Sequence, residues 1–451
     1  MKRTLIRNAV IVNEGRQAKG SVVIQGEKIA EVLADGQEPA QSCGEIIDAQ
    51  GSYLLPGVID GHVHFREPGL THKADIFSES RAAAAGGVTS IMDMPNTSPQ
   101  TITLEAWNEK TERMAQRSLV NYACYFGATQ TNHTLFSQLD PHRVCGIKLF
   151  MGSSTGDMLV DRMDSLQHIF NGTDLLIAAH CEDQNIINRN TAACKERYSF
   201  GKSPDADLPL RHHPEIRSAE ACYRSSELAV RLAQAANARL HILHITTGKE
   251  LELFEDKPAL EKKITAEVCI PHLLFTADDY QTLGARIKCN PAVKTEPNRT
   301  MLREALNSNR IDVIATDHAP HLPAEKEGGA LKALSGIPVI QFSLVSMLEL
   351  AEQGLFTIQK IVDKMCHTPA QIYRIRNRGY IRAGYQADLV IVKRRQTPVR
   401  IGPIYSKCNW SPLPENTTFR WEIEKTFING HSVYANRQLD DTYRGQALHF
   451  R

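Results

Sequence analysis

Two histidines and an arginine at alternating positions are the first residues in the chain that could do chemistry. They are His62, His64 and Arg66, followed by the turn-forming pair Pro68-Gly69. Along a β-strand, alternate side chains point to the same face, so these three are expected to project together. Two imidazoles at this spacing can bind one metal ion, and the guanidinium beyond them would face whatever the metal holds. Taken alone, such a pair is more commonly two structural histidines of a half-buried strand than a metal site. The rest of the chain is needed to decide between these two interpretations.

Strand and helix patterns alternate through the middle of the chain. Short apolar runs predict eight strands, at residues 58–65, 90–94, 122–127, 146–151, 175–180, 240–246, 264–269 and 311–317. Helical patterns lie between them, as at residues 75–85, 104–117, 215–236 and 299–307. This alternation predicts an α/β fold, a (β/α)₈ or TIM barrel. A doubly wound open sheet is the alternative, but no Gly-x-Gly-x-x-Gly follows the first strand.

Polar side chains that could bind a metal or a substrate stand at the carboxyl ends of these strands, where barrel active sites lie. Beyond the first strand, the candidates are Asn96, Lys148, His180, His244, Asp317 and His321. A chance scatter of the 17 histidines would not favour strand ends so consistently. Alternation separates close neighbours, so His241 faces away from His244 and His318 faces away from Asp317. We take His244 and Asp317 as the inward residues, because each lies at the end of its strand.

The two ends of the chain differ from the middle. Residues 1–55 and 380–451 contain short β-strand patterns punctuated by Gly, Asn and Asp. Neither end has enough apolar residues for a core of its own. We therefore expect one small β domain built from residues 1–55 and 380–451, beside a catalytic barrel of residues 56–379.

Composition excludes some classes of partner. The 52 Lys and Arg residues nearly balance the 51 Asp and Glu residues, so nothing favours nucleic acid or an anionic membrane. No apolar run is long enough to cross a bilayer. The ten cysteines are scattered singly without a Cys-x-x-Cys, which is typical of reduced thiols in the cytoplasm. We expect a cytoplasmic homo-oligomer, a dimer, that acts on a small molecule.

The arrangement resembles the amidohydrolase superfamily and, among its cyclic amidohydrolases, most closely the dihydroorotase family. The motifs that carry the resemblance lie at residues 60–69, 94–97, 290–293 and 317–321, and they span the whole barrel. The resemblance implies a barrel flanked by a β-sandwich built from both termini. It also implies a zinc-dependent enzyme of pyrimidine biosynthesis that reversibly cyclises N-carbamoyl-L-aspartate to L-dihydroorotate.

The resemblance further implies a ligand set for two Zn²⁺ ions per chain. One ion would be bound by His62, His64, Lys148 and Asp317, and the other by Lys148, His180 and His244. An ammonium cannot bind a metal, so Lys148 would have to be carboxylated by CO₂; its carbamate and a hydroxide would bridge the ions. Asp157, Asp161 and Asp164 are fallback ligands. Asp317 would be the catalytic residue that carries the proton between the hydroxide and the ring nitrogen.

Substrate choice is expected to depend on a carboxylate clamp. Arg66, Asn96 and His321 combine a guanidinium, an amide and an imidazole, and an arginine can hold a carboxylate through two hydrogen bonds. Dihydroorotate carries a ring carboxylate, whereas allantoin and simple hydantoins do not. A surface ion pair of Arg66 with Glu67 or Asp75 is the alternative reading of the arginine.

Two further expectations concern contacts with the substrate ring and a segment that could move. By resemblance, Asn290 and the backbone near Gly336 would contact the substrate ring. Residues 322–335 are polar and contain glycines, so they are a candidate mobile lid.

Two other functions stay open. One is an allantoinase or hydantoinase; the other is a catalytically inactive scaffold, which a missing ligand would mark, and no ligand is missing here.

Overall fold

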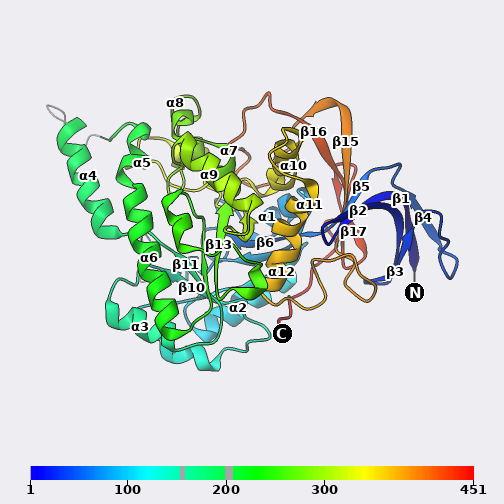
Figure 1. Cartoon of the computed structure of the whole chain (residues 1–451), viewed down its shortest axis with the longest axis horizontal. Helices are drawn as coiled ribbons and strands as arrows, with labels where there is room; N and C mark the ends of the chain where they lie inside the picture. The colour runs from blue at the N-terminus through cyan, green and yellow to red at the C-terminus, as the bar shows by residue number, and fades with distance from the viewer. Residues whose placement is uncertain (1, 153–157, 199–206) are drawn as a thin grey trace.

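The computed structural model describes residues 2–152, 158–198 and 207–451, and it confirms the predicted (β/α)₈ barrel with a small β-sandwich domain built from both termini (Figure 1). The barrel strands are β6 (Val58–Val63), β7 (Val88–Asp93), β8 (Asn121–Cys124), β9 (Phe126–Gly127), β10 (Ile147–Phe150), β11 (Ile177–His180), β12 (Leu240–Ile242), β13 (Ile264–Cys269) and β14 (Val313–Ala315). They pair in parallel in two runs, β6-β7-β8 and β9 through β14. Only Tyr125 separates β8 from β9, and the His64 amide donates to the His318 carbonyl at 2.8 Å, so the two runs meet at both ends.

The helices lie around the barrel (Figure 1). They are α1 (Ile76–Ala85), α2 (Leu104–Arg117), α3 (Met163–Asn171), α4 (Gln184–Tyr198), α5 (His213–Ile216), α6 (Ala219–Ala236), α7 (Ile270–Leu274), α8 (Tyr280–Leu283), α9 (Glu296–Asn307), α10 (Ser343–Glu352), α11 (Ile358–Val362) and α12 (Thr368–Ile372). Helix α1 begins after Asp75, whose carboxylate accepts from the Ser78 amide at 2.9 Å, and it ends at Gly86. In the described part of the chain, no helix is both long and apolar enough to span a bilayer.

One predicted helix is interrupted. The pattern at residues 215–236 predicts a continuous helix, whereas α5 ends at Ile216 and α6 begins at Ala219. The break occurs because the Ser218 hydroxyl accepts from the Ala221 amide at 3.3 Å and so caps a new helix. The residue at the break, Arg217, lines the cavity of the barrel.

Strands from both ends of the chain form one sheet beside the barrel (Figure 1). The strands are β1 (Arg3–Asn13), β2 (Arg16–Gln25), β3 (Lys28–Ala34), β4 (Glu45–Asp48), β5 (Tyr53–Pro56), β15 (Leu389–Arg400), β16 (Thr418–Ile428), β17 (His431–Ala435) and β18 (Gln438–Leu439). The two ends join where β5 pairs antiparallel with β15, with Leu54 opposite Ile391. Residues after this sheet return to the barrel, where the Leu448 amide donates to the Tyr122 carbonyl at 2.8 Å. The exact domain boundaries stay a prediction.

Candidate active site

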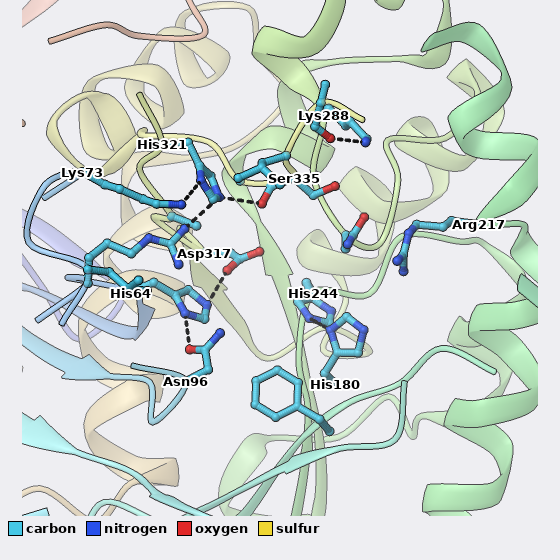
Figure 2. Close-up of a pocket in the computed structure, with 18 of the residues that line it drawn as sticks. His64, Lys73, Asn96, His180, Arg217, His244, Lys288, Asp317, His321 and Ser335 are labelled. Carbon is cyan, nitrogen blue, oxygen red and sulfur yellow. Dashed lines mark hydrogen bonds and ion pairs between the residues drawn. The ribbon is translucent and has the colours of Figure 1, made fainter. Parts of the chain in front are cut away.

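A cavity of about 840 Å³ opens at the carboxyl ends of the barrel strands (Figure 2). All eleven site residues predicted from the sequence line it: His62, His64, Arg66, Asn96, Lys148, His180, His244, Asn290, Asp317, His321 and Gly336. Parallel strands of a closed barrel bring their carboxyl ends to one rim, so residues far apart in the chain meet there. The structure therefore brings the predicted residues together at one cavity.

His62 and His64 converge on the carboxylate of Asp317. The Oδ1 atom of Asp317 lies 3.2 Å from His62 Nε2 and 3.0 Å from His64 Nε2. Strand β6 ends at Val63, and Arg66 has a positive φ of 68°, so strand alternation does not by itself aim Arg66 into the cavity. His244 and Asp317 also have positive φ, at 40° and 48°. Such backbone conformations are costly for residues other than glycine, and they cluster at functional sites.

Three of the four candidate histidine ligands are oriented by a side-chain acceptor on the far ring nitrogen. His62 Nδ1 donates to Glu267 Oε1 at 2.8 Å, and His64 Nδ1 donates to Asn96 Oδ1 at 2.8 Å. His180 Nε2 donates to Glu182 Oε2 at 3.0 Å. Each contact holds a proton on the far nitrogen, so the nitrogen that faces the cavity is the one that could bind a metal.

The second cluster joins His180, His244 and Lys148. His180 Nδ1 and His244 Nε2 lie 2.9 Å apart, within hydrogen-bonding distance, so the two ring nitrogens point toward each other. Lys148 on β10 is 1% exposed, and its Nζ lies 4.4 Å from the centre of the Phe150 ring. Burial lowers the pKa of Lys148 to about 8, so the free amine is accessible near neutral pH.

Negative charge surrounds the first histidine pair. Burial opposes ionisation of Asp317, but His62 and His64 hold its pKa well below the usual range. Burial alone would lower the pKa of His62, yet the carboxylates of Asp317 and Glu267 outweigh it and raise that pKa to about 9. The site thus favours a cation. The ligand atoms of His62, His64 and Asp317 lie within 4.8 Å of one another, a donor set that suits zinc.

The fallback ligands do not compete with Lys148 in the described part of the chain. Asp161 accepts from Gln130 Nε2 at 2.8 Å, and Asp164 accepts from Arg162 Nη2 at 2.6 Å. Neither lines the cavity. Asp157 lies outside the described residues.

His321 lies across the cavity from His180 and His244 (Figure 2), and Arg66, which also lines the cavity, contacts it. Arg66 Nε donates to the Pro320 carbonyl at 3.0 Å, and Arg66 Nη2 lies 3.1 Å from His321 Nε2. The expected alternative, an ion pair of Arg66 with Glu67 or Asp75, is not formed in the described structure. Glu67 instead accepts from Arg117 Nη1 at 2.9 Å, and Asp75 lies 3.1 Å from Lys407 Nζ.

Asn290 and Gly336 complete the wall near His321. Asn290 Oδ1 is buried and, among the described residues, has no hydrogen-bond partner, so it is available to a ligand. Gly336 has φ 149°, and a Cβ there would lie 2.4 Å from the Ala319 carbonyl oxygen, so only glycine fits. The Gly336 amide already donates to the Lys288 carbonyl at 2.9 Å, which leaves other backbone groups for the expected ring contact.

Several residues of the site gave no usable signal in the sequence. Lys73, Glu182, Glu267 and Arg217 were not predicted, although Lys73 and Arg217 line the cavity and the two glutamates orient His180 and His62. Glu182 is held in turn by an ion pair with Arg217. Glu182 follows His180 by two residues beyond a strand end, which is the one spacing that could have suggested it.

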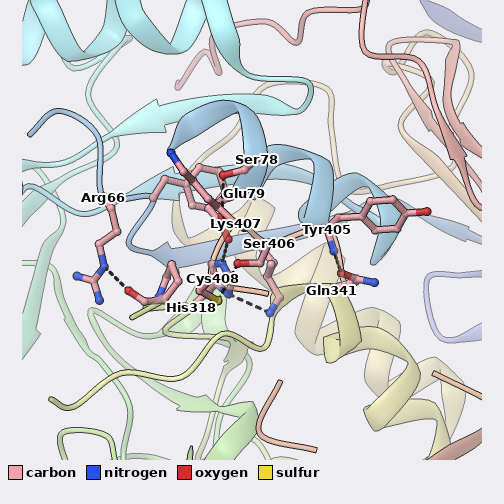
Figure 3. Close-up of polar contacts among 12 residues, drawn as sticks. Arg66, Ser78, Glu79, His318, Gln341, Tyr405, Ser406, Lys407 and Cys408 are labelled. Atoms are coloured by element: carbon pink, nitrogen blue, oxygen red, sulfur yellow. Dashed lines mark hydrogen bonds and ion pairs between the residues drawn. The ribbon is translucent and has the colours of Figure 1, made fainter. Parts of the chain in front are cut away.

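The C-terminal part of the chain supports the site from outside (Figure 3). Glu79 on α1 accepts from His318 Nε2 at 2.7 Å and from the Lys407 amide at 3.0 Å. His318 therefore points away from the cavity, into a buried network beside Asp317. Further along, Trp410 Nε1 donates to the His321 carbonyl at 2.7 Å. Residues after β15 thus contact the Glu79 that accepts from the His318 ring, and they contact the His321 backbone directly.

Residues 322–335, the candidate lid, are anchored at several points. Lys326 Nζ donates to the carbonyls of Lys288, Leu334 and Gly336 at 3.0, 2.7 and 2.8 Å. Asp207 accepts from the Leu331 amide at 2.9 Å. Residues 330, 331 and 333–335 of the segment line the cavity, and its movement stays a prediction.

The chain is similar to known proteins both in sequence and in structure. Residues 53–433 match the amidohydrolase family. A dihydroorotase of Halobacterium salinarum is 34% identical over 422 residues, which cover 91% of this chain and 92% of the relative. An allantoinase of Deinococcus radiodurans is 30% identical over 452 residues, 98% of each chain. The solved L-hydantoinase (dihydropyrimidinase) of Arthrobacter aurescens has a TM-score of 0.89 at 25% identity, covering 98% of both chains.

Proposed function

Because the chain belongs to the amidohydrolase family, we propose that it is a dihydroorotase, which reversibly converts N-carbamoyl-L-aspartate into L-dihydroorotate and water in pyrimidine biosynthesis. One observation carries the choice of substrate. The Arg66 guanidinium, with Lys73 and His321 around it, forms a cationic wall of the cavity that also contains the metal-type ligands. A ring carboxylate would match that wall, and dihydroorotate carries one whereas allantoin and simple hydantoins do not.

We further propose that these residues bind two zinc ions. We assign His62, His64 and Asp317 to one ion, His180 and His244 to the other, and a carboxylated Lys148 to both. The convergent ring nitrogens and the low pKa of Asp317 support this assignment. When bound, the two ions would supply an activated water and a polarised amide carbonyl.

Lys148 must be modified to serve as a ligand. Its free amine would attack CO₂, forming a nitrogen–carbon bond while one proton leaves the nitrogen, and the product is an anionic carbamate. Burial makes that free amine available by lowering the pKa of Lys148 to about 8. The surrounding apolar side chains, including Phe150, exclude water that would otherwise favour the ammonium.

Asp317 is proposed to move the proton. Its Oδ1 atom faces both His62 and His64, which leaves Oδ2 as the oxygen that can take a proton. In ring opening, Oδ2 would accept the proton of the attacking water and deliver it to the leaving ring nitrogen. In ring closure the protonated Asp317 would help the reacting carboxylate lose its oxygen as water.

The clamp would hold the carboxylate that does not react. Arg66 Nη atoms and His321 would donate to it, and the Asn96 amide would add a third donor. Asn96 Oδ1 accepts a hydrogen bond from His64, so the NH₂ group of Asn96 is the part of the amide that could donate to a substrate. Asn290 Oδ1, which lacks a protein partner among the described residues, would accept from a ring N–H.

A hydantoinase or allantoinase is the second candidate, favoured by the similarity to the Arthrobacter aurescens L-hydantoinase and the Deinococcus radiodurans allantoinase. The decisive experiment incubates zinc-loaded protein with dihydroorotate, allantoin and hydantoin separately and follows ring opening of each. Ring opening of dihydroorotate, with kcat/KM at least tenfold above the other two, supports the proposal. Preference for allantoin or hydantoin would replace it with the second candidate.

A further inference from the structure

The imidazole of His321 lies between two cationic side chains. Lys73 Nζ lies 3.1 Å from His321 Nδ1, and Arg66 Nη2 lies 3.1 Å from His321 Nε2. The Ser335 carbonyl oxygen is also 3.0 Å from Nε2. Lys73, Arg66 and His321 are each no more than 8% exposed, so little of each side chain is accessible to solvent. Figure 2 shows Lys73 reaching His321 from one side and Ser335 from the other.

A count of protons decides between the two neutral forms of the ring. An ammonium group can only donate hydrogen bonds, so a hydrogen bond from Lys73 requires a lone pair on His321 Nδ1. The ring proton is then on Nε2, where it donates to the Ser335 carbonyl. With the proton on Nδ1 instead, the Lys73 and Ser335 contacts would both be repulsive, and only the contact with Arg66 would be satisfied.

We propose that Lys73 is a positioning residue, which holds His321 as the neutral Nε2–H tautomer and thereby leaves the Arg66 Nη groups for the substrate carboxylate. This inference rests on the proposed function, because it deepens the account of the carboxylate clamp. With a proton on Nε2, His321 cannot accept from Arg66 Nη2. The two groups then present N–H donors side by side, and an incoming carboxylate can accept from both.

The charges around His321 agree with a neutral ring. Burial and the nearby charges of Arg66, Lys73 and Lys326 hold the pKa of His321 far below its ordinary value. The nearby carboxylate is Glu325, whose Oε2 lies 3.6 Å from His321 Nδ1 and whose Oε1 lies 2.7 Å from Lys73 Nζ. Glu325 therefore holds the Lys73 ammonium in place at hydrogen-bonding distance from the ring.

The first test reads the tautomer directly and needs no substrate. Protein labelled with ¹⁵N-histidine would be compared with a His321→Asn variant to assign the His321 ring signals. We expect wild-type His321 to carry its proton on Nε2 between pH 6 and 8. In Lys73→Met we expect a mixture of the two neutral tautomers and a His321 pKa above that of the wild type, because one of the neighbouring charges that lower it is gone. A wild-type ring with its proton on Nδ1 would overturn the inference even if Lys73→Met does not fold.

The second test separates positioning from general support of the fold. In Lys73→Met we expect KM for dihydroorotate at pH 8 to rise roughly 10- to 100-fold, the range for lost hydrogen bonds to a charged group, with kcat within about threefold. The KM should recover as the pH is lowered and His321 becomes protonated, because Nε2 then donates again. A purely structural role for Lys73 would give no such recovery.

Matched variants complete the design. Lys288→Met removes another lysine from the lining of the same cavity, but Lys288 Nζ bonds to the Ala333 carbonyl and not to His321, so the pH-dependent KM should not develop. Lys73→Arg keeps a donor for Nδ1 and should restore part of the wild-type behaviour. A pH-independent KM in Lys73→Met, or the same pH dependence in Lys288→Met, contradicts the inference. Failure of the wild type to open dihydroorotate would instead contradict the proposed function, while the tautomer measurement would still stand.

Discussion

The Nδ1 atom of His62 lies 2.8 Å from the Glu267 carboxylate, on the opposite side of the ring from Asp317. Both side chains are almost fully buried, at 1% and 0% exposure. The glutamate holds the proton on Nδ1, so Nε2 is the ring nitrogen that faces the cavity and could bind a metal. Carboxylates in this position orient metal-binding histidines and make them better donors.

Glu267→Gln should therefore weaken metal binding. We expect the dissociation constant for zinc, measured by competition with a chelating dye, to rise about 10- to 100-fold, as removal of such partners does. Glu250→Gln is the matched control, because Glu250 is equally buried but accepts from Ser226 and Thr247 hydroxyls rather than from a histidine. Equal effects of the two substitutions would show that burial of a glutamate, not its contact with His62, matters.

Lys148→Ala should lose one or both metal ions, since the proposed carbamate is the only group shared by the two ligand sets. Elemental analysis of wild-type protein purified without chelator should find about two ions per chain, as a two-metal site requires. Added acetate or propionate should restore part of the activity of the variant by supplying a bridging carboxylate. Fully active wild-type protein with one ion, or with an unmodified Lys148 by mass spectrometry, would reject the bridge.

Carboxylation of Lys148 should depend on pH. With the pKa of Lys148 at about 8, half of the amine is free at pH 8, whereas at pH 6 roughly one part in a hundred is free. Metal-free protein given ¹³C-bicarbonate should thus form the carbamate many times faster at pH 8 than at pH 6 at the same dissolved CO₂. The Lys148→Ala variant sets the background signal, and equal rates at both pH values would count against attack by the free amine.

Arg66→Lys should not be conservative, because a point charge replaces a planar group with two parallel donors. We expect kcat/KM for dihydroorotate to fall about 30-fold, or about 2 kcal/mol of transition-state binding, within the range for charged hydrogen bonds. Most of the loss should be in KM, since the clamp contacts the carboxylate that does not react. An unchanged kcat/KM would remove Arg66 from the clamp.

The direction of the reaction should follow pH. Ring closure turns the dianion of N-carbamoyl-L-aspartate into a monoanion plus water, so it consumes one proton. Above the carboxylate pKa of about 4, the equilibrium should shift about tenfold toward ring opening for each pH unit. If Asp317 carries the proton, kcat for opening should rise with pH and kcat for closure should fall, with apparent pKa values that belong to the coupled site. If kcat rises with pH in both directions, or falls with pH in both, Asp317 is not the residue that carries the proton.

The sequence alone was enough to predict the architecture and the residues that converge. Apolar runs and helical spacing are local properties, so they located the barrel strands, including β10 around Lys148 and β11 before His180. The parallel barrel then implies that the carboxyl ends of those strands share one rim. That geometric rule brought His62, His180 and Asp317 into one prediction although up to 255 residues separate them.

Tertiary structure decided what orients these residues. Glu267 belongs to an apolar run and lies 205 residues from His62, so no local pattern connects the two. Arg217 reaches Glu182 only because Ser218 caps α6 and breaks the expected helix. Lys73 and Trp410 come to His321 from a loop before α1 and from a segment after β15. Hydrogen bonds across such distances, and the proton positions they impose, depend on the packing of the folded chain, whereas sequence periodicity records only which face of an element is buried.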